Sequence, residues 1–106
     1  MYVDEETIIL EYSLEQAIAD GVLVEVFKNR WDELSQGKPI VATANLFSQV
    51  SLAGLLEIWN EYVEWRTQVM PSLPEEDQLF STTMNGDKIW LLEDGQAFTM
   101  LYPEDY

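Results

Sequence analysis

The chain has 106 residues, of which 47 % are hydrophobic, and it contains four Phe, four Trp and five Tyr. This length and composition predict one folded domain, residues 1–106, around one apolar core. Twenty Asp and Glu face only five Lys and Arg, which gives a formal net charge of −15. So few cations argue against direct binding to nucleic acid or to an anionic membrane surface, because both require many basic side chains.

The sequence also contains features that indicate the cellular compartment and the need for cofactors. It contains no Cys, which excludes disulfides and thiolate chemistry. It begins MYVDEE, which is acidic where a signal peptide needs a basic segment. No stretch approaches the roughly 20 apolar residues of a membrane span. We therefore expect a cytoplasmic protein without a cofactor.

The first elements are expected to be short. Thr7–Glu11 has the apolar content of a short strand. Ser13 is a suitable N-cap for a helix from Leu14 to about Ala19, and Gln16 stands where a capping box needs it. Gly21 can end that helix in a left-handed conformation.

Two further short elements and a turn-like segment follow. Val22–Phe27 is apolar on both faces apart from one Glu, which predicts a buried strand. Lys28–Gln36 predicts a short helix that Gly37 closes. The next run, PIVATANLF, predicts an extended or turn-like segment that becomes helical before Ser51.

The strongest helical pattern covers about residues 51–70, and Pro71 ends it. Its apolar positions follow helical spacing. The residues expected on the buried face are Leu52, Leu55, Leu56, Trp59, Val63 and Met70. Glu57, Glu61, Glu64 and Gln68 follow the same spacing on another face. The helix should therefore pack across one face of a sheet.

The C-terminal third predicts three strands, Leu79–Met84, Lys88–Leu92 and Ala97–Tyr102. The first turn is Asn-Gly, the strongest short hairpin signal, and the second is Glu-Asp-Gly. We expect a three-stranded antiparallel meander that strands of the first half extend. The fold class is α+β, a single small domain with an antiparallel sheet and one long amphipathic helix.

Catalytic and metal-binding residues are not expected. The chain has no His and no Cys, so the common general base and soft metal ligands are missing. No Ser or Thr stands beside a plausible activating base, and there is no Gly-rich phosphate loop. Glu75, Glu76 and Asp77 lack the alternating spacing of a calcium loop. A hydrolase that uses only carboxylates and a metal ion is the remaining enzymatic alternative.

The acidic stripe of the long helix allows two interpretations. Glu57, Glu61 and Glu64 span about 10 Å of one face. They can be the wet side of an ordinary amphipathic helix, or a row of charges that imitates nucleic-acid phosphates toward a basic groove. Of the five Lys and Arg, only Arg66 and Lys88 lie outside the segment Lys28–Lys38. This concentration of the cations in one segment favours mimicry.

Aromatic and tail residues complete the candidate contacts. Most of the helix aromatics should be core, but Trp65 stands between Glu64 and Arg66 and is expected to be partly exposed, where it can anchor a partner. The tail Tyr102–Tyr106 can be a contact segment, although fraying is the default for a terminus.

Three stretches carry a resemblance to known proteins: YSLEQAIADGVLVEV at residues 12–26, the Pro39–Thr43 step, and DGQAFTMLYPEDY at the C-terminus. They resemble a small uncharacterised family found in phages, plasmids and bacterial genomes, with a DGVLVDV-type signature. Glu25 stands where that family has Asp. The family has no established activity, so the resemblance implies only a mobile-element setting.

Small acidic proteins from that setting are similar in character to anti-CRISPR and anti-restriction proteins. We therefore expect a non-enzymatic inhibitor in the host cytoplasm that binds a basic protein or ribonucleoprotein complex of a host defence system. The expected partner-binding residues are Glu57, Glu61, Glu64, Trp65, Glu75, Glu76 and Asp77. The alternative is a small acidic structural or regulatory interaction module without mimicry.

Overall fold

A computed structural model describes residues 13–106 of the chain, and the expected strand at 7–11 lies outside them. The helices are α2 (Leu14–Ala19), α3 (Trp31–Ser35), α4 (Ala44–Gln49) and α5 (Leu52–Gln68). The strands are β1 (Leu23–Glu25), β2 (Ile40–Thr43), β3 (Phe80–Met84), β4 (Asp87–Glu93) and β5 (Phe98–Leu101). Short 3-10 turns η1 to η4 cover Lys28–Arg30, Met70–Ser72, Glu75–Asp77 and Pro103–Asp105.

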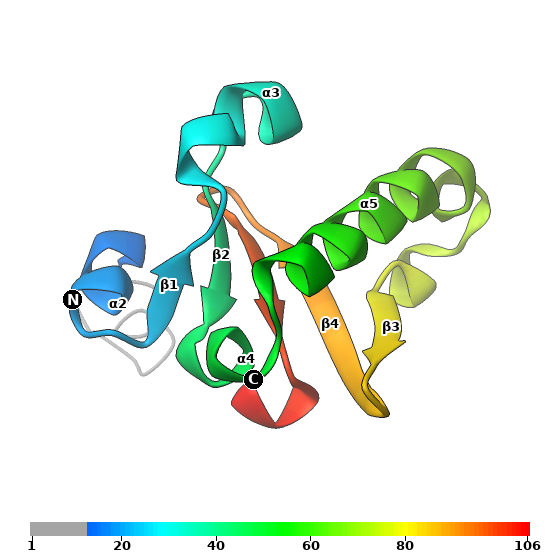
Figure 1. Ribbon diagram of the computed structural model, residues 1–106. Coiled ribbons are helices and arrows are strands. Elements are labelled where there is room, and N and C mark those ends of the chain that lie inside the picture. The colour runs from blue at the N-terminus through cyan, green and yellow to red at the C-terminus, as the bar shows by residue number, and fades with distance from the viewer. Residues whose placement is uncertain (1–12) are drawn as a thin grey trace, which may run out of the picture.

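The strands form one open five-stranded sheet in the order β1-β2-β5-β4-β3 (Figure 1). The C-terminal meander and its extension by strands of the first half are confirmed, as is the α+β class. The sheet is mixed rather than wholly antiparallel, because β2 and β5 run parallel. The chain returns from the meander beside β2, where Ile40 pairs with Phe98 and Ala42 with Met100.

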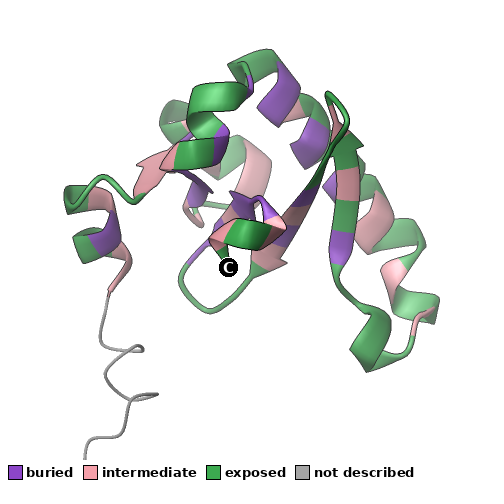
Figure 2. Cartoon of the chain, turned by 90° about the horizontal axis from the view of Figure 1, so that it is seen from below, coloured by how far each residue is buried: buried purple, intermediate pink, exposed green. Residues whose placement is uncertain are grey.

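The long helix begins and ends where local chemistry requires. Ser51 caps it, because its Oγ accepts a hydrogen bond from the Gly54 amide at 3.1 Å. After Gln68 the chain continues into η2, which contains Pro71. Buried residues gather where α5 and the sheet meet (Figure 2). The expected helix at about 51–70 is thus confirmed to within two residues.

The buried face of α5 differs from the expected one. Leu55 and Trp59 are buried as expected, but Leu52 and Val63 are 55 % and 39 % exposed. The residues that fill their place in the core are Ile58 and Tyr62. The helix is therefore rotated toward its aromatic side, because Tyr62 packs edge-on against both Phe80 and Phe98 of the sheet.

The N-terminal elements largely match their local signals. Ser13 Oγ accepts a hydrogen bond from the Gln16 amide at 3.1 Å, and Gly21 is left-handed with φ 76°. The Gln16 side chain bonds Asp20 rather than completing a capping box. The strand expected at 22–27 is shorter, because Phe27 has a left-handed backbone, φ 57°, and starts η1.

The C-terminal tail does not fray, so that expectation is wrong. Asp105 Oδ2 accepts hydrogen bonds from Thr43 Oγ1 at 2.8 Å and from the Tyr102 amide at 3.3 Å, and its Oδ1 accepts one from Asn45 Nδ2 at 3.2 Å. The ring of Tyr106 lies edge-on against Trp90. These contacts join the tail to the β2–α4 junction and to β4.

Candidate acidic binding face

The candidate site is formed where α5 packs along β3. Near its start, a side chain at Gly54 would stand 3.6 Å from Met84 Sδ, at the end of β3. In its middle, Glu61 Oε1 accepts a hydrogen bond from Thr82 Oγ1 at 2.7 Å. The helix and the strand therefore run antiparallel and side by side, so that the start of α5 lies near the end of β3.

Three carboxylates follow α5 along this strand. Glu57, Glu61 and Glu64 are all exposed and lie within about 60° of one another around the helix axis, as 3.6 residues per turn requires. We call them the acidic flank. Within residues 13–106 none of the three forms an ion pair with Lys or Arg. Among residues 13–106, the only hydrogen bond described for any of the three side chains is the Thr82–Glu61 contact, which holds Glu61 toward β3.

Trp65 provides an aromatic surface beside the acidic flank. It is half-buried, as expected, and its ring centroid lies 5.5 Å from that of Phe80 and 6.0 Å from that of Tyr62. A shallow groove of about 290 Å³ runs over Trp65 and Phe80, and its rim includes Glu61 and Glu64. The structure therefore brings an aromatic ring together with two carboxylates that form no ion pair within residues 13–106.

The second predicted acidic segment occupies a different place. Glu75, Glu76 and Asp77 form η3 in the connection from α5 to β3 (Figure 1), and all three are exposed. No ion pair joins them to the part of the chain that the structure describes. Gln78 holds this connection by donating to the main-chain oxygens of Met70 and Leu73. They add negative charge beyond the C-terminal end of α5.

The cations of the chain lie away from this face. Lys28 pairs with Glu25 at 3.4 Å and Arg30 with Glu33 at 3.0 Å. The Arg30 guanidinium, by its hydrogen bond and its charge, lowers the pKa of the Glu33 carboxyl. Lys88 lies on β4 opposite Thr83 of β3, and the next residue of β4, Ile89, points into the core. Because side chains alternate along a strand, Lys88 points away from α5.

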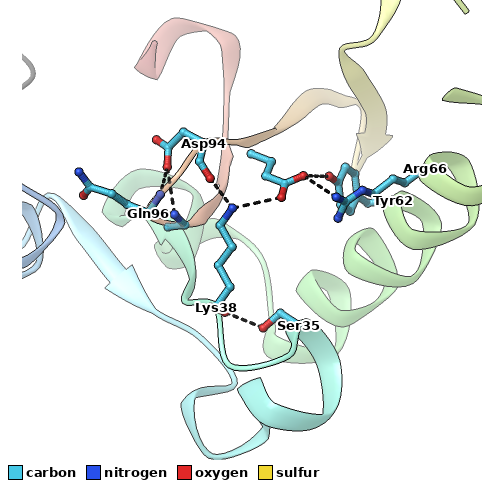
Figure 3. A network of polar contacts seen from close by, with 8 residues as sticks. Ser35, Lys38, Tyr62, Arg66, Asp94 and Gln96 are labelled. Atoms are coloured by element: carbon cyan, nitrogen blue, oxygen red, sulfur yellow. Dashed lines mark hydrogen bonds and ion pairs between the residues drawn. The ribbon is translucent and has the colours of Figure 1, made fainter. Parts of the chain in front are cut away.

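The other two cations meet at Glu93, in a network shown in Figure 3. Glu93 Oε2 lies 3.1 Å from Lys38 Nζ, and Oε1 lies 3.0 Å from Arg66. Lys38 also donates to the main-chain oxygen of Asp94, and both cations lie over the ring of Phe98. The pairing of Lys38 with Glu93 across 55 residues has no sequence signal, so sequence reasoning missed it.

This network lines a cleft of about 600 Å³ between α3 and α5, on the other side of α5 from β3. Tyr62 reaches its floor, where its hydroxyl lies 3.4 Å from Glu93 Oε1. Burial raises the pKa of the Tyr62 phenol to about 12, and Glu93 adds to the rise while Arg66 opposes it. Arg66 thus neutralises Glu93 in the cleft and does not reach across to the acidic flank.

The described residues contain neither a candidate metal site nor a membrane-spanning helix. No group of three or more Asp or Glu in residues 13–106 is arranged to hold a metal ion. No helix within these residues is both long and apolar enough to cross a membrane.

Comparisons with protein-family models, with curated proteins and with solved structures find no match.

Proposed function

We propose that this protein is a non-enzymatic inhibitor whose acidic face binds a basic surface on another protein, one that otherwise holds nucleic-acid phosphates. The observation that carries the proposal is the acidic flank. Glu57, Glu61 and Glu64 form a row about 10 Å long without ion pairs in residues 13–106. Lys and Arg side chains of a partner can supply the missing counter-charges.

The distribution of cations supports this reading. Arg66 lies on the same helix as the acidic flank, but it pairs with Glu93 on the other side of α5. Arg66 therefore does little to reduce the negative electrostatic potential along the flank. The net charge of −15 extends this potential toward a basic partner. Trp65 adds an aromatic anchor next to the charges, as binding hot spots commonly have.

The setting of a host defence complex comes from the resemblance of residues 12–26 to phage- and plasmid-borne proteins. A nuclease complex that grips DNA or RNA presents the basic groove that an acidic mimic needs. Inhibition then follows from competition, because the groove cannot hold the mimic and the nucleic acid together.

The test is affinity purification of the tagged protein from a host that carries defence systems, followed by mass spectrometry. We expect a nucleic-acid-binding protein to be retained at about 50 mM salt and largely released at about 500 mM, because salt screens exposed charges. Nucleic acid added in excess should also release it.

A matched pair of variants locates the binding surface. The triple variant Glu57→Lys, Glu61→Lys, Glu64→Lys should lose the partner. The control triple Glu15→Lys, Asp32→Lys, Glu104→Lys changes the net charge equally at exposed positions on other elements and should keep it. Equal retention by the two triples would contradict the assignment of the flank.

The alternative is an interaction module that binds through apolar contacts around Trp65, with an acidic surface that only aids solubility. The groove over Trp65 and Phe80 supports it. In that case Trp65→Ala should release the partner, the flank triple should retain it, and affinity should change little with salt.

A further inference from the structure

Within residues 13–106, no strand covers the outer edge of β3. β3 lies at one end of the sheet and pairs only with β4 among the described strands (Figure 1). Asn85 and Gly86 both have positive φ, 55° and 86°, as in the two-residue type I′ turn. That turn makes Met84 and Asp87 a hydrogen-bonded pair. Hydrogen-bonded and non-hydrogen-bonded pairs alternate along an antiparallel ladder, so the main-chain groups of Thr82 also point toward β4.

The same alternation directs the main-chain N–H and C=O groups of Ser81 and Thr83 away from β4. Both residues are exposed, and outside the β3–β4 ladder no main-chain hydrogen bond from residues 13–106 is described for them. Two residues with outward donors and acceptors can bind a further strand through up to four main-chain hydrogen bonds.

This edge lacks the features that usually protect a sheet edge. The run Phe80–Met84 contains no charged residue and no Pro, and its register with β4 is continuous, without a bulge. At the other end of the sheet, β1 has only three residues and includes Glu25. The unprotected edge is therefore the one beside the acidic flank.

The spacing of the flank suits an added strand. Along α5, Glu57 to Glu61 rises about 6 Å and Glu61 to Glu64 about 4.5 Å. In a strand, side chains on one face repeat about every 6.6 Å. Every second residue of a strand added to β3 faces α5, so each can meet one carboxylate of the flank.

Building on the proposed function, we propose that the partner contributes an extended segment with Lys or Arg at alternate positions, which adds to the edge of β3 as a sixth strand. The main-chain groups of Ser81 and Thr83 hold its backbone. Its basic side chains extend over the sheet to the acidic flank, and one of their alkyl stems covers Trp65 in the groove. Charge alone would not require alternation; the strand geometry does.

Two synthetic peptides of equal composition and charge test this, Thr-Lys-Val-Lys-Val-Lys-Thr and the block control Thr-Val-Lys-Lys-Lys-Val-Thr. Titrations at about 50 mM salt should show the alternating peptide binding about tenfold more tightly. Amide exchange at Ser81 and Thr83 should slow only with the alternating peptide, because these amides become hydrogen-bonded.

Variants and modified peptides then isolate the main-chain bonds. Thr83→Pro removes an outward N–H while leaving the β3–β4 ladder intact, and should reduce binding of the alternating peptide to the level of the block control. Thr83→Ala should bind normally. If Thr83→Pro does not fold, N-methylated peptides replace it. Methylation of the Val amides should abolish the gain for an antiparallel strand, and methylation of the Lys amides for a parallel one.

Equal affinity for both peptides, or tight binding that survives both N-methylation patterns, would overturn strand addition. If that equal binding is still lost in the Glu57, Glu61, Glu64 triple variant, the acidic face remains the binding surface and only the strand is wrong. Sedimentation adds one more outcome. A dimer that Thr83→Pro dissociates would overturn the proposal, because the edge would then belong to a second copy.

Discussion

Glu61 on α5 accepts a hydrogen bond of 2.7 Å from the hydroxyl of Thr82 on β3. This contact joins the acidic flank to the edge strand, and no ion pair from residues 13–106 occupies Glu61 Oε2. The residue that links the helix to the sheet is therefore also the central charge of the candidate binding face.

The link should be measurable as a coupling between the two residues. In a double-mutant cycle with Glu61→Gln and Thr82→Val, we expect a coupling of about 0.5–1.5 kcal/mol in the free energy of unfolding, the range of an ordinary hydrogen bond, because solvent screens this exposed charge. Urea unfolding measures it. Glu64→Gln paired with Thr82→Val is the control, and a coupling as large there would contradict the specific contact.

The tail should contribute to stability through Asp105. Asp105→Ala leaves the Thr43 hydroxyl without its acceptor and releases Asn45, so we expect a loss of about 1–3 kcal/mol. Asp105→Asn keeps one oxygen acceptor and should lose less. Thermal unfolding compares the variants, and Glu104→Ala, which alters an exposed neighbour, is the control. Equal melting temperatures for Asp105→Ala and Glu104→Ala would show that the tail does not contribute.

Substitution of Gly54 by Ala should destabilise the protein, although Gly→Ala usually stabilises a helix. Gly→Ala inside a helix normally stabilises by about 1 kcal/mol. Here the added Cβ would lie 2.7 Å from Val50 Cγ1, on a buried and stiff β-branched side chain. We therefore expect Gly54→Ala to lower the melting temperature. Gly95→Ala, which meets nothing within 4 Å, should be neutral or mildly stabilising. A rise with Gly54→Ala would contradict this tight packing.

Tyr62 should make stability depend on pH in the alkaline range. Its pKa in the folded protein is about 12, against an ordinary value near 10, so the folded state keeps a proton that the unfolded state loses. The stabilisation is complete below about pH 10 and is lost as pH rises toward 12, by at most about 1.4 kcal/mol per pH unit. Urea unfolding at several pH values should show a flatter slope for Tyr62→Phe. Tyr106→Phe, which changes an exposed ring, should leave the slope unchanged.

The local parts of the fold could be read from the sequence because their signals lie within a few residues. Ser51 and Pro71 bracket α5, and Asn85-Gly86 defines the β3–β4 hairpin. The acidic flank could be read as well, since its spacing is that of the helix. Its function as a binding surface stays a prediction.

Other features required the packed structure, because they join segments far apart in the chain. The parallel pairing of β2 with β5 brings Ile40 beside Phe98, and no local pattern encodes such a partner. The rotation of α5 is similar. Both Val63 and Tyr62 are apolar enough for the core, and contact with Phe80 and Phe98 selects Tyr62.

By itself, the sequence determined the α+β class, the long helix, the C-terminal hairpin and a surface with a large negative charge. Only the tertiary structure decided which charges stay free. Arg66 lies two residues from Glu64, but its partner Glu93 comes from the end of β4. Helical periodicity can place charges on faces, whereas ion pairs between distant elements depend on how those elements pack. Within residues 13–106, that packing leaves the acidic flank without ion pairs, beside an edge of β3 that no other strand covers.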